Sequence, residues 1–209
     1  PAAGVTGVGV LSTFAFVLIV ITAMMILIFR DWRINAAALA LQYLAAFMLV
    51  TLSWPIGLAI VKLIAGWMAT AAIALTCLRQ KNTRDSIESG ASLVFRGLAG
   101  LLIILLIFIL TPGLQASVFP QVDLLILQGG LMLLGMSLMQ LGTNAEPYLT
   151  VISLLSFLAG FEVIHAALEL STLLTGLLVV VNLGLALVGV YFTIRAGEPG
   201  KSSAEVGDV

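Results

Sequence analysis

The chain alternates between long apolar segments and short polar or proline-containing breaks. A helix needs about 20 mostly apolar residues to cross a bilayer, and charged, Pro and Gly clusters mark where such helices end. The main breaks are RDWR (30–33), Pro55, the polar loop 79–92, TPG (111–113) with the loop 114–122, and TNAEP (143–147). The pattern therefore predicts seven membrane-spanning helices, at about 8–29, 34–54, 56–78, 93–110, 123–141, 148–168 and 170–194.

The composition supports this prediction. Of the 209 residues, 61% are hydrophobic and only 9% are charged, and the mean hydropathy is +1.21. A soluble domain carries roughly a quarter charged residues, because it has to cover its surface with polar groups. We therefore expect an all-α integral membrane protein. The sequence has no basic tract typical of nucleic-acid binding, and its single cysteine, Cys77, excludes a disulfide within the chain.

The basic residues predict the orientation of the helices. If the 30–33 loop lies in the cytoplasm, eight of the nine Lys and Arg residues fall at cytoplasmic helix ends, as the positive-inside rule requires. These eight are Arg30, Arg33, Arg79, Lys81, Arg84, Arg96, Arg195 and Lys201. We expect a multi-pass protein of a prokaryotic inner membrane, with its N-terminus outside and its C-terminus in the cytoplasm. The first apolar segment lacks a basic region before it, so we expect a retained helix and not a cleaved signal peptide.

Three ionisable residues are predicted to lie at membrane depth: Lys62, Glu162 and the only histidine, His165. Such groups are costly in a bilayer, so they usually face protein or water and carry a function. Glu162, His165 and Glu169 share one face of a helix by their spacing, although Glu169 is expected at the outer helix end. We interpret Lys62, Glu162 and His165 as candidates for a proton relay. A static ion pair of Lys62, or a hydrogen-bonded core histidine, would explain the same residues structurally.

Two neutral polar residues extend this group and indicate an internal repeat. Gln42 and Lys62 are 20 residues apart, and so are Glu162 and Asn182, at a constant offset of 120. The first three and the last three predicted helices also have the same layout. We expect two three-helix units in parallel, joined by one connecting helix, since an odd connector preserves the orientation of the second copy. The divisions are 1–78, the loop and connector 79–122, 123–195, and a polar tail at 196–209, which we expect to be disordered.

The segments AALALQYLAAFML, IVKLIAGWMATAAIAL and SFLAGFEVIHAALEL resemble component E of hydrogenase-4 and formate hydrogenlyase complexes. That family is similar to two copies of the three-helix K subunit of respiratory complex I, to which the C subunit of Mrp antiporters is related. The resemblance implies that Lys62 and Glu162 are the buried lysine and glutamate of these helices, with His165 near a histidine. Gln42 and Asn182 stand where an acid is expected.

The resemblance implies a non-catalytic membrane subunit of a proton-translocating complex I-like or group 4 hydrogenase-type complex. Its partners would be antiporter-like subunits and the subunits that anchor a quinone or hydrogenase module. Lys62, Glu162 and His165 would form the relay, and Gln42 and Asn182 would support it. We expect neither a bound cofactor nor catalysis within this chain, because it has no phosphate loop, metal motif or nucleophile–base pair. A structural subunit of another respiratory or photosynthetic complex, or a stand-alone ion transporter, are the alternatives.

Overall fold

The computed structural model describes residues 2–79, 90–144, 146–169 and 171–197, and side chains from residue 9 onward. Seven helices make up nearly all of this part of the chain, and each is long and apolar enough to cross a membrane. The protein is therefore an all-α, multi-pass membrane protein, as the sequence predicts. The helices are α1 (Ala2–Ile28), α2 (Trp32–Val50), α3 (Ile56–Arg79), α4 (Gly90–Ser117), α5 (Leu124–Thr143), α6 (Pro147–Leu168) and α7 (Thr172–Gly197).

Short polar residues fix several helix beginnings. The side chains of Asp31 and Asp123 accept hydrogen bonds from the backbone N–H groups of Arg33 and Leu125, which caps the N-termini of α2 and α5. Pro147 occupies the first position of α6, where its missing N–H costs nothing. At its other end α2 stops at Val50 and not at 54. Residues 51–53 form a turn before Trp54 and Pro55. The basic residues 81, 84 and 201, which are expected at cytoplasmic helix ends, lie outside the described residues. The same holds for the tail from 198.

The connecting helix α4 corrects one prediction. The sequence predicts an end at 110 and a loop at 114–122, yet the helix continues through Pro112 to Ser117. A proline inside a helix removes one backbone hydrogen bond, and in membranes neighbouring hydroxyl groups commonly compensate. The carbonyl that Pro112 leaves without its helical N–H partner is that of Phe108. The nearby Thr111 and Ser117 hydroxyls donate to the carbonyls of Ile107 and Gly113. The TPG sequence therefore lies inside a helix and does not end it.

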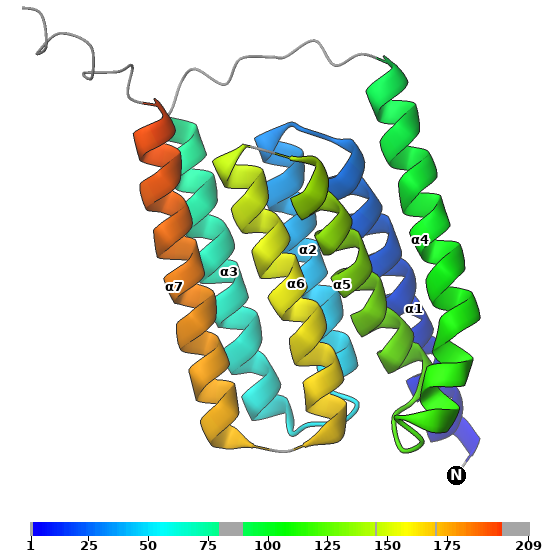
Figure 1. Cartoon of the computed structure of the whole chain (residues 1–209). Coiled ribbons are helices and arrows are strands. Elements are labelled where there is room, and N and C mark those ends of the chain that lie inside the picture. Colours follow the sequence, from blue (N-terminus) through cyan, green and yellow to red (C-terminus); the bar gives the residue numbers. More distant parts are fainter. Residues whose placement is uncertain (1, 80–89, 145, 170, 198–209) are drawn as a thin grey trace, which may run out of the picture.

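The helices form two rows of three, which we call the first unit (α1, α2 and α3) and the second unit (α5, α6 and α7) (Figure 1). Within each unit neighbours in sequence pack together, and across the rows α1 packs on α5, α2 on α6 and α3 on α7. Paired helices run in the same direction (Figure 1). Helix α4 lies at the end of the rows against α5 and α1. The two units predicted in parallel thus contact each other helix by helix.

The two units are stacked face to back. Helices α6 and α7 begin 115 and 116 residues after α2 and α3, at Pro147 against Trp32 and at Thr172 against Ile56. In this register the buried α6 positions 152, 156, 159 and 163 correspond to 37, 41, 44 and 48 of α2, none of which is buried. These α6 positions are therefore more covered than their α2 counterparts, two of which are exposed and two partly buried, as expected for units related by a translation.

This register also corrects the predicted offset of 120. Counted from the helix beginnings, Glu162 corresponds to Phe47, and Lys62 corresponds to Leu178. Glu162 is thus not the counterpart of Gln42, nor Asn182 that of Lys62. The repeated layout is present, but the polar residues that indicated it are not equivalent positions.

All basic residues of the described part except Lys62 gather at one end of the bundle, which we call the arginine end: Arg30, Arg33, Arg79, Arg96 and Arg195. In Figure 1 this is the upper end, where α1, α3 and α7 finish and α4 begins. The clustering agrees with the pattern on which the predicted orientation rests.

Candidate functional site

A buried ion pair joins the two units. The ammonium of Lys62 on α3 lies 3.8 Å from Oε2 of Glu162 on α6. The two residues are only 6% and 5% exposed. Lys62 and Glu162 are therefore brought together by the stacking of the units, although exactly one hundred residues separate them in sequence.

The pair is poorly satisfied, which makes it chemically labile. Among the described residues, neither the Lys62 ammonium nor Oε1 of Glu162 has a hydrogen-bond partner. Two charges removed from water lose several kcal/mol of solvation each, and only close pairing and further hydrogen bonds repay this loss. A single proton transferred from the ammonium to the carboxylate would remove both charges. The arrangement can therefore exist as an ion pair or as a neutral pair, and it can take up or release a proton at the carboxyl group.

Beside the ion pair is a small cavity lined by residues of α2, α3 and α6: Tyr43, Ala46, Phe47, Val50, Lys62, Leu63, Ala159, Glu162 and Val163. It has room for about one water molecule. Most of its lining is aliphatic or aromatic, and the ion pair and the Tyr43 side chain supply its polar groups. The Tyr43 hydroxyl donates a hydrogen bond to Oδ1 of Asn182 on α7, at 2.9 Å. Asn182 is therefore linked to the site through Tyr43.

Further polar contacts continue toward the arginine end. Ser156 donates to Oε1 of Gln42 at 3.1 Å, and Gln140 donates to the carbonyl of Ile26 at 2.9 Å. Both contacts connect the first unit with the second. These side chains form a second polar group on the far side of α2, next to Ser137.

Asn144 completes this series at the arginine end. Its side-chain amide donates to the carbonyl of Gln140, and its oxygen accepts hydrogen bonds from Arg30 and Arg96. Arg30 also pairs with Glu146 at 3.8 Å. Polar groups thus occur at successive depths between the ion pair and the basic end of the bundle.

On its other side the ion pair is bounded by an aromatic layer of Trp54, Phe161 and His165. The Lys62 ammonium lies 4.6 Å from the centre of the Trp54 ring. Trp54 contacts His165 edge to face at 6.5 Å between ring centres, and Phe161 stacks on His165 at 6.1 Å. Nδ1 of His165 and Nε1 of Trp54 have no hydrogen-bond partner. The Trp54 ring therefore contacts both His165 and the Lys62 ammonium of the ion pair.

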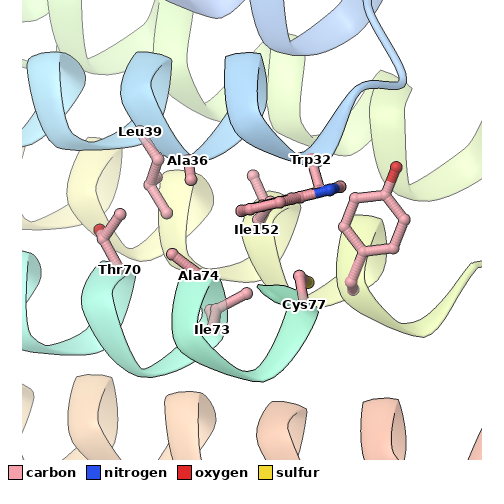
Figure 2. Close-up of a pocket in the computed structure, with 9 residues that line it drawn as sticks. Trp32, Ala36, Leu39, Thr70, Ile73, Ala74, Cys77 and Ile152 are labelled. Atoms are coloured by element: carbon pink, nitrogen blue, oxygen red, sulfur yellow. The ribbon is translucent and has the colours of Figure 1, made fainter. Parts of the chain in front are cut away.

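A second indentation, near the arginine end, is lined without any charged side chain (Figure 2). It lies between α2, α3 and α6 and is lined mainly by aliphatic and aromatic side chains, with Thr70 and Cys77 among them. Its free space is too narrow for a water molecule. It contains no charged residue, so the cavity at the ion pair is the better candidate for chemistry.

The predicted site residues fall into two sets. The structure brings Lys62, Glu162 and His165 together, while Gln42 and Asn182 lie at neighbouring depths and do not touch the ion pair. Glu169 is exposed just beyond the last residue of α6, as expected. Within the described part of the chain, no group of three or more His, Cys, Asp or Glu residues could hold a metal ion.

Sequence reasoning missed Trp54, Tyr43 and Ser156. Trp54 resembles a residue at a helix end, and Tyr43 and Ser156 resemble ordinary helix positions. The nearest signal was position: Tyr43 adjoins Gln42, and Ser156 lies six residues before Glu162. Their contacts depend on how the units are stacked.

No family model, no curated protein and no solved structure matches this chain. The geometry of the site is therefore the basis for inferring a function.

Proposed function

We propose that this protein is a membrane subunit of a proton-translocating complex of the complex I-like or group 4 hydrogenase type. In this proposal the Lys62–Glu162 pair takes up and releases a proton within the membrane. The observation that carries the proposal is that pair itself: two oppositely charged groups, almost fully buried, beside a cavity large enough for about one water molecule. The ammonium and Oε1 of Glu162 have no hydrogen-bond partner among the described residues.

Each polar residue has a defined part in this proposal. Glu162 binds the proton, and Lys62 supplies the counter-charge that favours its release. Tyr43 and Asn182 provide a hydroxyl and an amide next to the cavity. Gln42 supports the second polar group through its contact with Ser156. His165 exchanges protons on the side of the Trp54 ring that faces away from Lys62.

The partners in this proposal are other membrane subunits, among them antiporter-like subunits and those that anchor a quinone or hydrogenase module. Helix α4 suits contact with lipid or with such a subunit, because its outer surface is apolar. Its exposed side chains include Val94, Leu98, Leu101, Leu105 and Ile109. The N-terminus would face the outside and the arginine end the cytoplasm.

The test is the Glu162→Gln variant, assembled in its native complex and isolated in inverted membrane vesicles. The amide keeps the size of the side chain but cannot carry a proton, so we expect proton translocation to be lost while the complex still assembles. The measurements are proton uptake per electron transferred and the amount of assembled complex. Glu169→Gln is the matched control, since this carboxylate is exposed at the helix end. Normal translocation by Glu162→Gln would sink the proposal.

One observation favours a second function, that of a structural subunit. The ion pair and the contacts Tyr43–Asn182, Gln42–Ser156 and Gln140–Ile26 all join one unit to the other. Polar groups can hold membrane helices together in this way. In that case Glu162→Gln reduces the amount of assembled complex, and the translocation per assembled complex stays normal.

A further inference from the structure

We propose that Trp54 is a positioning residue of the ion pair: its indole ring holds the Lys62 ammonium in place beside Glu162. The inference rests on the proposed function, because it assigns a part in the same proton exchange to a residue that does not itself titrate. It concerns the side of the ion pair that faces away from the Tyr43 cavity.

Lys62 makes few polar contacts. A lysine ammonium has three N–H donors on a flexible stem, and none of them forms a hydrogen bond within the part of the chain that the structure describes. Its two recorded contacts are Oε2 of Glu162 at 3.8 Å and the Trp54 ring at 4.6 Å. When Glu162 is protonated the charge attraction disappears. The ring is then the contact that keeps the ammonium at the site.

The indole ring of Trp54 is well suited to attract a cation. A cation within about 6 Å of an aromatic centre is attracted to the ring face, and tryptophan binds cations best among the aromatic side chains. This attraction strengthens when both groups are removed from water. Trp54 and Lys62 are only 4% and 6% exposed. Both conditions for a strong contact are therefore met.

Backbone hydrogen bonds on both sides of Trp54 fix the position of this residue. It follows the turn after α2, where its N–H bonds to the carbonyl of Val50 at 2.9 Å, and it precedes Pro55, whose carbonyl accepts from Leu58 and Ala59 at the start of α3. The indole ring therefore sits on a tight connection and reaches Lys62 two helical turns further along. Contact with His165 supports the ring from α6.

The experiment compares three variants in the assembled complex: Trp54→Leu, Trp54→Phe and Trp67→Leu. Loss of a cation–π contact of about 1 kcal/mol corresponds to a change of about fivefold in an equilibrium or rate constant. For Trp54→Leu we therefore expect the rate of proton uptake to fall about fivefold, and the uptake per electron to fall with it. Phenylalanine keeps a ring and should restore part of the ratio. Trp67 is the matched control, a half-exposed tryptophan of α3 that bonds to the carbonyl of Ala40. A normal ratio in Trp54→Leu, or equal losses in Trp54→Phe and Trp54→Leu, overturns the proposal.

A second measurement does not depend on translocation. The chain has three tryptophans, so Trp32→Phe with Trp67→Phe leaves Trp54 as the single indole emitter. Adding Lys62→Met should shift its emission, because the ammonium lies against the ring, whereas Arg33→Met should not. An unchanged emission in Lys62→Met refutes the contact. If Glu162→Gln translocates normally while the emission shifts, the proposed function fails and the contact between Trp54 and Lys62 stands.

Discussion

The two three-helix units have the same topology but opposite chemistry at their shared interface. The first unit contributes Lys62 and Tyr43, and the second contributes Glu162 and Asn182. Counted from the helix beginnings, Glu162 corresponds to the apolar Phe47, so each unit carries groups that the other lacks. Neither unit can satisfy its buried polar residues alone. The difference teaches that the site belongs to the interface and to neither repeat.

The units also differ in how closely their first two helices approach. A Cβ added to Gly160 of α6 would lie 2.8 Å from the carbonyl oxygen of Gly130 on α5. In the register of 115 the counterparts of these glycines are Ala15 and Ala45, both fully buried. Small residues let membrane helices pack closely. The second unit therefore has backbones in contact where the first has room for methyl groups.

Lys62→Met should have the largest effect on stability. Removing one partner of a buried ion pair leaves an uncompensated charge and costs about 3–5 kcal/mol of unfolding free energy. Adding Glu162→Gln in the other unit should recover most of this loss, because no charge then remains buried. Equilibrium unfolding in mixed micelles measures both. Additive losses in the double variant would show that the two units are not coupled through this pair.

Gly160→Ala should have an intermediate effect, since the new methyl group meets backbone atoms of α5. Overpacking of this kind costs about 1–3 kcal/mol. The reverse change in the first unit, Ala45→Gly, should cost about 1 kcal/mol, mainly from helix propensity. Gly176→Ala serves as control, because a Cβ there meets open space. Equal losses for Gly160→Ala and Gly176→Ala would contradict the difference in packing.

Tyr43→Phe should have the smallest effect, about 1 kcal/mol, because it removes one buried hydrogen bond between the units. Asn182→Leu should remove the same bond from the other side, so that the double variant loses little more than either single one. Tyr191→Phe, at an exposed ring, is the control and should leave the unfolding free energy unchanged. Fully independent losses at positions 43 and 182 would argue against the bond.

Much of the fold could be predicted from the sequence because bilayer thickness and charge control it. Apolar length gave all seven helices along the described residues, and the predicted start of the fifth at 123 falls on the capping residue of α5. Pro112 misled the prediction for α4, because a proline signals a helix end in water more reliably than in a membrane. The two three-helix units could be predicted from the repeated layout of the helices alone.

The site could be predicted only in part. Lys62, Glu162 and His165 stood out because ionisable residues are rare at membrane depth. Their pairing could not be inferred, because it depends on the depth at which α3 and α6 lie relative to each other. The regular spacing of 20 suggested a different register, and Trp54 carries no polarity signal at all. Contacts between helices come from packing, which periodicity does not encode.

The face-to-back stacking has a consequence for how such a chain can change over generations. In a homodimer with a two-fold axis each position recurs on both sides, so one substitution alters two contacts at once. Here each copy presents a different surface to the interface, and a substitution alters it only once. One copy could therefore acquire a lysine and the other a glutamate independently. Because both copies belong to one chain, two like repeats can hold opposite charges face to face.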